Sequence, residues 1–162
     1  MSTKKIKLHN IALQGADVFN IRFHPGEQLW GVPSSPFRKY WTPAIGPASV
    51  RLYEVLSELT QNGPVEVTTS ELAKRVGIKD NRVRGALARI GGVFSGEVVR
   101  PEDGSPVQIS LPAGVCPPSH KVRRSCYPEV LHEEFDAYLN VVGVTLVESG
   151  LGSPSMGAGL DV

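Results

Sequence analysis

The sequence predicts an α+β fold in which one compact domain, at residues 44–112, carries a β-rich N-terminal extension and a C-terminal helix. Three observations lead to this prediction. Apolar residues recur at helical spacing in three stretches within residues 46–90. Two strand-like runs follow at 93–100 and 106–111, with an Asp-Gly turn signal between them. A length of 162 residues suits one such domain with appendages.

Residues 1–43 are expected to form the β-rich extension and a proline-rich connector. Residues 5–13 and 18–24 alternate loosely between apolar and polar side chains, which favours a hairpin. Five prolines within residues 25–47 argue against a helix or a central strand there. We expect the aromatic side chains of the connector to pin it to the core: Trp30, Phe37, Tyr40 and Trp41.

Two short basic segments leave alternatives open. Residues 37–41 interleave Arg38 and Lys39 with three aromatic rings, a pattern that can rest on a phosphate backbone. We favour the interpretation that the rings are buried and the two cations reach water past them. Residues 121–124 hold three cations, which either extend a DNA footprint or pair with the acidic residues that follow.

The central domain is expected to begin with a helix at residues 46–59 and a short strand at 65–68. Proline favours the first position of a helix, so Pro47 marks its start. Four apolar residues at spacings of three give this helix one apolar face, and an Asn-Gly-Pro sequence ends it.

Two further helices are predicted from capping signals. Thr68 and Glu71 have the spacing of a capping box, which opens a helix that ends before Gly77. Asp80 is a suitable N-cap for the next helix, at residues 80–90, and the glycine pair that follows is expected to end it. The order of these elements is therefore helix, strand, helix, turn, helix, hairpin.

Residues 113–148 are expected to hold a connector and an amphipathic helix at 128–140, and residues 149–162 a flexible Gly- and Ser-rich tail. The helix either packs back on its own domain or forms the interface of a homodimer. The apolar residues that would serve either role are Leu131, Phe135, Tyr138 and Leu139.

A helix-turn-helix pattern occupies residues 69–90. A small residue, Ala73, stands where two helices would cross, and Gly77 stands at the turn. Buried aliphatic residues are expected on either side: Leu72, Val76, Ile78 and Val83. With the helix, strand and hairpin around it, this stretch resembles the winged helix-turn-helix DNA-binding domains of bacteria and phages. The resemblance implies that the 80–91 helix reads the major groove.

A helical wheel of residues 80–90 separates two faces. Val83, Ala86, Leu87 and Ile90 form the core face. Asn81, Gly85 and Ala88 lie opposite, flanked by Arg82 and Arg89 on one side and Arg84 on the other. Small residues let such a face enter a groove, where Asn can pair with adenine and Arg with guanine. Glycine inside a helix costs about 1 kcal/mol relative to alanine, so close approach of another backbone would explain Gly85.

Charge is unevenly distributed although the net charge is only +1. Residues 70–90 hold six Lys or Arg against two acidic residues, whereas residues 128–162 hold six acidic residues and no Lys or Arg. Double-stranded DNA is therefore the predicted partner. A wing contact by Arg100 is left open, because Glu102 and Asp103 adjoin it. The candidate contact residues are Lys74, Arg75, Lys79, Asn81, Arg82, Arg84, Gly85, Arg89 and Arg100.

Other classes of protein receive less support. We expect no enzyme, because no phosphate loop, dinucleotide fingerprint or Gly-x-Ser-x-Gly motif is found. No membrane span, no cofactor and a cytoplasmic location are expected. Cys116, His120, Cys126 and His132 are the side chains that zinc prefers, but their spacing matches no known zinc pattern, so we expect no metal.

The predicted function is sequence-specific DNA binding in transcriptional regulation. One alternative is a DNA-binding accessory protein of replication or recombination. Another is a winged-helix module that docks on the transcription machinery through the acidic helix at 128–140.

Overall fold

The computed structural model describes residues 3–26 and 30–149 and shows an α+β fold. Two compact units, Met1–Val122 and Arg123–Val162, are described separately below. The helices are α1 (Thr3–Leu13), α2 (Ser35–Ile45), α3 (Pro47–Leu59), α4 (Thr69–Val76), α5 (Asp80–Val93), α6 (His120–Cys126) and α7 (Glu129–Ser149). The strands are β1 (Val18–Gly26), β2 (Trp30–Gly31), β3 (Val65–Thr68), β4 (Glu97–Val99) and β5 (Val107–Val115).

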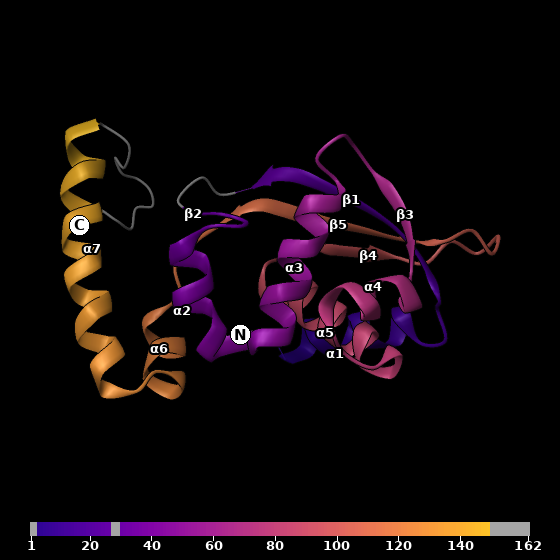
Figure 1. Cartoon of the computed structure of the whole chain (residues 1–162), viewed down its shortest axis with the longest axis horizontal. Coiled ribbons are helices and arrows are strands. Elements are labelled where there is room, and N and C mark those ends of the chain that lie inside the picture. The colour runs from indigo at the N-terminus through magenta and orange to yellow at the C-terminus, as the bar shows by residue number, and fades with distance from the viewer. Residues whose placement is uncertain (1–2, 27–29, 150–162) are drawn as a thin grey trace. The chain divides into compact units, whose positions relative to one another are not determined.

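The first unit is a strongly curled, mixed sheet with helices on one side (Figure 1). The strand order is β2-β5-β1-β3, and β4 pairs with β5 outside this path. β1 and β5 run parallel, with Phe19 opposite Val107 and Ile21 opposite Ile109, and all four side chains are buried. Because side chains alternate along a strand, Arg22 points to the other face and is exposed.

The core lies between this sheet and the helices. Tyr53 of α3 is fully buried, and its hydroxyl donates to the Pro112 carbonyl at 2.6 Å. Burial raises the pKa of this hydroxyl far above its ordinary value. Its ring packs edge to face on Phe37 at 5.5 Å and lies 5.2 Å from Phe94. These contacts join α2, α3 and the end of α5.

The predicted N-terminal hairpin is wrong in its first half. Residues 3–13 form α1, and only the second segment becomes a strand. Ile6, His9 and Leu13 fall at helical spacing, and the side chains of His9 and Leu13 are buried. α1 packs against α5. Tertiary packing on a distant helix therefore decides the conformation of this segment.

The proline-rich connector contains a helix, α2, which the sequence analysis excluded. Ser34 caps it by accepting a hydrogen bond from the Phe37 amide at 3.3 Å. Pro36 stands in the first turn, where the missing amide costs little, and Pro43 stands near the last turn. The expected burial of the aromatic residues is confirmed: Trp30, Phe37, Tyr40 and Trp41 are each at most 6% exposed.

Between residues 47 and 115 the elements follow the predicted order, with different ends. α5 continues through Gly91 and Gly92 to Val93, so the glycine pair does not end it. The N-cap of α5 is Lys79, and Asp80 is the first residue of the helix. β5 extends beyond the predicted hairpin to Val115.

The order of elements along the chain does not give the pairing of β3 in the sheet. In the structure β3 pairs antiparallel with β1, and β1 separates it from β5. β1 comes from the N-terminal extension, which is therefore an integral part of the sheet.

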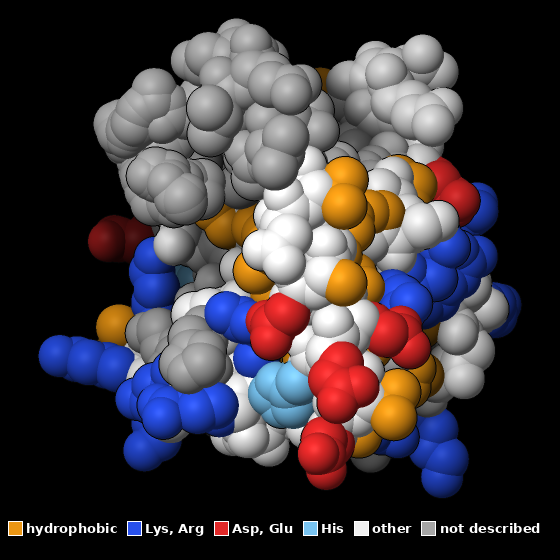
Figure 2. Space-filling view, turned by 90° about the vertical axis from the view of Figure 1, so that its left-hand side faces the viewer, with side chains coloured by type: hydrophobic (Ala, Val, Ile, Leu, Met, Phe, Trp, Pro, Cys, Tyr) orange, Lys and Arg blue, Asp and Glu red, His pale blue; other side chains and the backbone are white. Residues whose placement is uncertain are grey.

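The second unit contains α7, which extends beyond the predicted helix at 128–140. The Arg123 guanidinium lies over the Phe135 ring, 4.6 Å from its centre, and pairs with Asp136 at 3.3 Å. Acidic and apolar side chains gather along α7 in the space-filling view (Figure 2). The predicted flexible tail lies outside the described residues, apart from Ser149, which ends α7. In the part of the chain that is described, no helix is long and apolar enough to span a membrane.

Of the predicted dimer contacts on this helix, Phe135 is fully buried within the chain. Leu131, Tyr138 and Leu139 are half-buried. Among the α7 residues whose side chains are described, up to residue 141, the exposed large apolar ones are Val130 and Val141, at 67% and 68%.

Candidate nucleic-acid interface

The turn between α4 and α5 is built by a left-handed glycine. Gly77 has φ +86°, a conformation that side chains rarely adopt, and its amide donates to the Ala73 carbonyl at 2.8 Å. The Ile78 amide donates to the same carbonyl at 3.1 Å. At the other end of α4, the Thr68 hydroxyl accepts from the Glu71 amide at 3.1 Å, as the capping signal predicts. Local signals thus fix both ends of α4 and the path into α5.

The core side of this motif agrees with the sequence analysis. Leu72, Ala73 and Val83 are buried, at most 3% exposed. Val76 and Ile78 are half-buried. α4 and α5 both pack on α3.

The N-terminal half of α5 presents a polar, uncovered face. Asn81, Arg82 and Gly85 are exposed. Neither the Asn81 nor the Arg82 side chain has a hydrogen bond or ion pair within the described ranges. A Cβ added at Gly85 would meet no described atom within 4 Å. Nothing in the fold thus accounts for glycine at this position.

The C-terminal half of α5 is covered by α1, contrary to expectation. Ala88, expected to face outward, is fully buried. A Cβ added at Gly91 would lie 2.8 Å from His9 Nδ1, and one at Gly92 would lie 2.9 Å from the Ile6 backbone nitrogen. The glycine pair therefore allows the two helices to approach closely. The part of the predicted outward face of α5 that stays uncovered consists of Asn81, Arg82, Gly85 and Arg89.

His9 is the polar residue at this contact that the sequence analysis missed. Its side chain is 8% exposed, and its Nδ1 atom has no hydrogen-bond partner among the described residues. Burial lowers the pKa of His9 below 6.5, with Lys5 acting in the same direction, against a hydrogen bond with the Ala88 backbone. The neutral form therefore suits this helix contact.

Arg84 is held within the protein. Its Nη1 atom donates to the Ala16 carbonyl at 2.8 Å and to the Asp17 carboxylate at 3.2 Å. This side chain ties α5 to the segment that joins α1 and β1. In this structure Arg84 positions α1, and it is less available for a groove contact.

Arg89 and Arg100 also have backbone partners. Arg89 Nη1 lies 3.5 Å from the Ile45 carbonyl, a long contact that leaves most of its donors available. Arg100 donates to the Ala12 carbonyl at 3.2 Å and to the Gln14 carbonyl. Arg100, the predicted wing contact, is thus engaged at the end of α1.

The remaining predicted cations lie at the α4–α5 junction. Lys74 and Arg75 stand in the last turn of α4. Lys79 occupies the N-cap position of α5, and its side chain makes no capping hydrogen bond. All three are exposed, as is Arg82 in the next turn. We call Lys74, Arg75, Lys79 and Arg82 the junction cluster. Four exposed cations beside an uncapped helix start suit a polyanion.

In the described part of the chain, the side chains that zinc prefers form no recognisable site. No group of three or more His, Cys, Asp or Glu residues within the described ranges is placed to hold a metal ion. Cys116 belongs to the first unit, whereas Cys126 and His132 belong to the second. The side chain of His120 lies outside the described part.

Comparison of the chain with protein-family models, with curated proteins and with solved structures finds no match.

Proposed function

We propose that this chain binds double-stranded DNA in a sequence-specific manner, with the N-terminal half of α5 in the major groove, and that it acts in transcriptional regulation. The observation that carries the proposal is the uncovered face of Asn81, Arg82 and Gly85 beside the junction cluster. An asparagine and an arginine on one turn offer the donors that recognise adenine and guanine.

The fold we propose for residues 46–115 is a modified winged helix. The order α3-β3-α4-α5-β4-β5 is that of a winged-helix domain. The fold differs from a simple winged helix in two respects: β1 is inserted between β3 and β5, and α1 packs beside α5. The N-terminal extension would then be an addition to a winged helix, inserted into its sheet.

The proposed roles divide between the two halves of the site. Asn81 and Arg82 contact base edges, and Gly85 lets the helix backbone approach the DNA. Lys74, Arg75 and Lys79 contact phosphates and set the orientation of the domain. Arg89 is a candidate for a further phosphate contact through its remaining donors. Arg84 and Arg100 hold α1 in place.

The first test is fluorescence anisotropy with a mixed-sequence duplex across a salt series. Four phosphate contacts predict a log–log salt slope of about −3.6, since each contributes about −0.9. The double variant Lys74→Ala/Lys79→Ala should bind more weakly and lose about 2 from the magnitude of that slope. Arg22→Ala is the control, because Arg22 is an exposed cation on the sheet face away from the core.

Two results would contradict the proposal: no DNA binding by the wild type at low salt, or equal losses of DNA affinity in the double variant and in Arg22→Ala.

Specificity is tested by selection from a random duplex library. Asn81→Ala should relax the preference at one or two positions of the selected site. Mapping bound sites in the host separates regulation, with sites at promoters, from an accessory role at a replication origin.

A further inference from the structure

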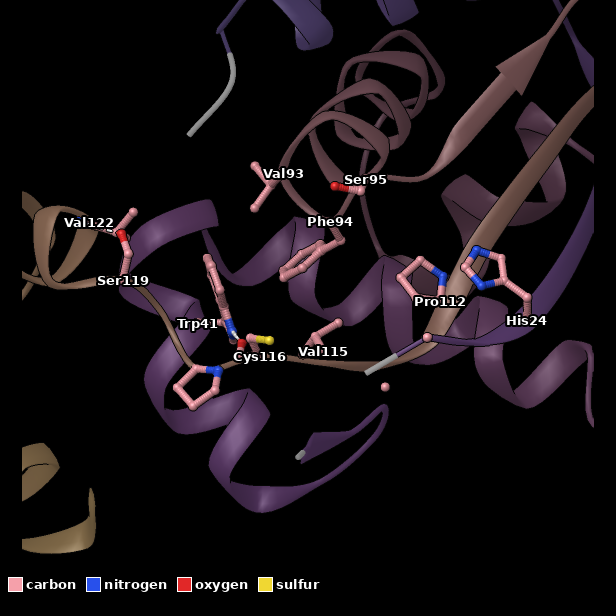
Figure 3. Close-up of a pocket in the computed structure, with 13 residues that line it drawn as sticks. His24, Trp41, Val93, Phe94, Ser95, Pro112, Val115, Cys116, Ser119 and Val122 are labelled. Carbon is pink, nitrogen blue, oxygen red and sulfur yellow. Dashed lines mark hydrogen bonds between the residues drawn. The ribbon is translucent and has the colours of Figure 1, made fainter. Parts of the chain in front are cut away.

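The first unit contains a pocket of about 490 Å³, away from the uncovered face of α5. It lies among the ends of β1 and β5, helix α2 and the turn after α5. His24 and Pro112 stand at one end, Ser119 and Val122 at the other, with Trp41 between them (Figure 3). Its volume is in the range of small-molecule sites, about 300–1,000 Å³.

The walls of the pocket are aromatic and held in place. The rings of Trp41 and Phe94 meet edge to face at 4.7 Å. Trp41 Nε1 donates to the Cys116 carbonyl at 2.9 Å. Trp41 and Phe94 are only 6% and 9% exposed, so their positions are set by the core. The pocket is therefore preformed, which lowers the entropic cost of binding a ligand.

The described lining of the pocket contains few polar side chains and no charged ones. His24, Ser95, Cys116 and Ser119 supply the polar side-chain atoms, and no Lys, Arg, Asp or Glu is among the described residues that line the pocket. Among these described lining residues, a charged ligand would find no Lys, Arg, Asp or Glu to offset its lost hydration. A neutral molecule pays no such cost.

Ser95 adds an independent observation. It has φ +59°, in the left-handed region, where glycine is the usual residue after a helix end. Serine at this position carries a conformational cost that glycine would avoid. Ser95 is one of the residues that line the pocket. Strained backbone positions cluster at functional sites, so serine here points to a contact in the pocket.

We propose that this pocket binds a small, neutral aromatic molecule of one or two rings that carries a hydroxyl or similar polar group. The rings would lie against Trp41 and Phe94, and the polar group would exchange a hydrogen bond with Ser95 or His24. Edge-to-face contacts with fixed aromatic walls favour a planar ligand over a flexible chain. The proposal does not depend on DNA binding.

The test is isothermal titration calorimetry of the full chain with 2-naphthol, a neutral two-ring probe. We expect a saturable one-site isotherm, and at least a tenfold weaker affinity for the anionic analogue 2-naphthoate. Cys116→Phe should abolish binding, because its ring would occupy the pocket from an exposed position while the backbone carbonyl stays available to Trp41. Ser95→Gly should weaken binding about three- to tenfold.

Ser105→Gly is the matched control for Ser95→Gly, since Ser105 is exposed and does not line this pocket. Thermal unfolding of each variant shows whether the fold is retained, and Ser95→Gly should unfold at an equal or higher temperature. Absence of saturable 2-naphthol binding by the wild type would overturn the proposal. Unchanged affinity in folded Cys116→Phe, or equal affinity for 2-naphthoate, would overturn it as well.

Discussion

Gly85→Ala should make the protein more stable and its DNA complex weaker. Gly85 lies in the interior of α5, is exposed, and has no described atom within 4 Å of an added Cβ. Alanine at an exposed position within a helix is favoured over glycine by about 1 kcal/mol. None of the described residues opposes that gain. A loss on adding the methyl group would therefore come from a bound partner.

The two effects have opposite signs and separate assays. A gain of about 1 kcal/mol raises the midpoint of thermal unfolding by roughly 4 °C for a unit of this size. If the α5 backbone approaches DNA closely, the methyl group must displace atoms of a packed interface, at about 1–3 kcal/mol. That cost corresponds to a loss of affinity of about 5- to 150-fold, which anisotropy at fixed salt measures directly.

Gly31→Ala is the matched control, because Gly31 also lacks a positive φ and has no described atom within 4 Å of an added Cβ. It lies in β2, away from α5. Its affinity for DNA should equal that of the wild type. If Gly85→Ala binds DNA as tightly as Gly31→Ala, the inferred close approach is refuted. If Gly85→Ala fails to raise the unfolding temperature, the description of α5 as unhindered at this position is wrong.

Three further variants test how α1 and α2 are held. The free energy of unfolding should fall as the pH drops below about 6.5, because His9 binds a proton in the unfolded chain but resists protonation when buried. In His9→Gln, thermal unfolding between about pH 7.5 and 5 should lack the pH dependence that His9 contributes. Gly92→Ala should destabilise by about 1–3 kcal/mol in denaturant titrations, since its Cβ would meet the backbone of Ile6, and an unchanged midpoint would contradict the close helix contact. Arg38→Ala should cost about 1–3 kcal/mol, because Arg38 Nε donates at 2.9 Å to Glu54, whose carboxylate is buried; Arg38→Lys should recover part of the loss.

The elements predicted correctly are those whose ends are fixed by neighbouring residues. The Thr68 hydroxyl and left-handed Gly77 define α4 through contacts within a few positions, and these signals are visible in a sequence. The prolines of α2 argue against a helix only when their positions are ignored. Pro36 in the first turn and Pro43 near the last turn leave the middle of that helix intact.

The conformation of α1 and the sheet position of β1 depend on contacts far along the chain. α1 packs on α5, more than 65 residues away along the chain, and β1 is placed between β3 and β5 by pairing with both. Neither partner could be identified from local patterns. One signal was available at Gly91 and Gly92: two glycines inside an apolar helical pattern indicate a close backbone neighbour as readily as a helix end.

The same packing limits what α5 could read if it binds DNA as proposed. With Ala88 buried under α1, the proposed base-reading residues are confined to Asn81, Arg82 and the approach at Gly85. A helix rises 1.5 Å per residue, so Asn81 to Gly85 spans about 6 Å, or roughly two base pairs at 3.4 Å each. Including Arg89 extends the span to about 12 Å, less than four base pairs. So short a contact cannot define a unique genomic site from one chain. Sequence-specific action through this face therefore requires either two copies on adjacent half-sites or recognition of DNA shape outside the contacted bases.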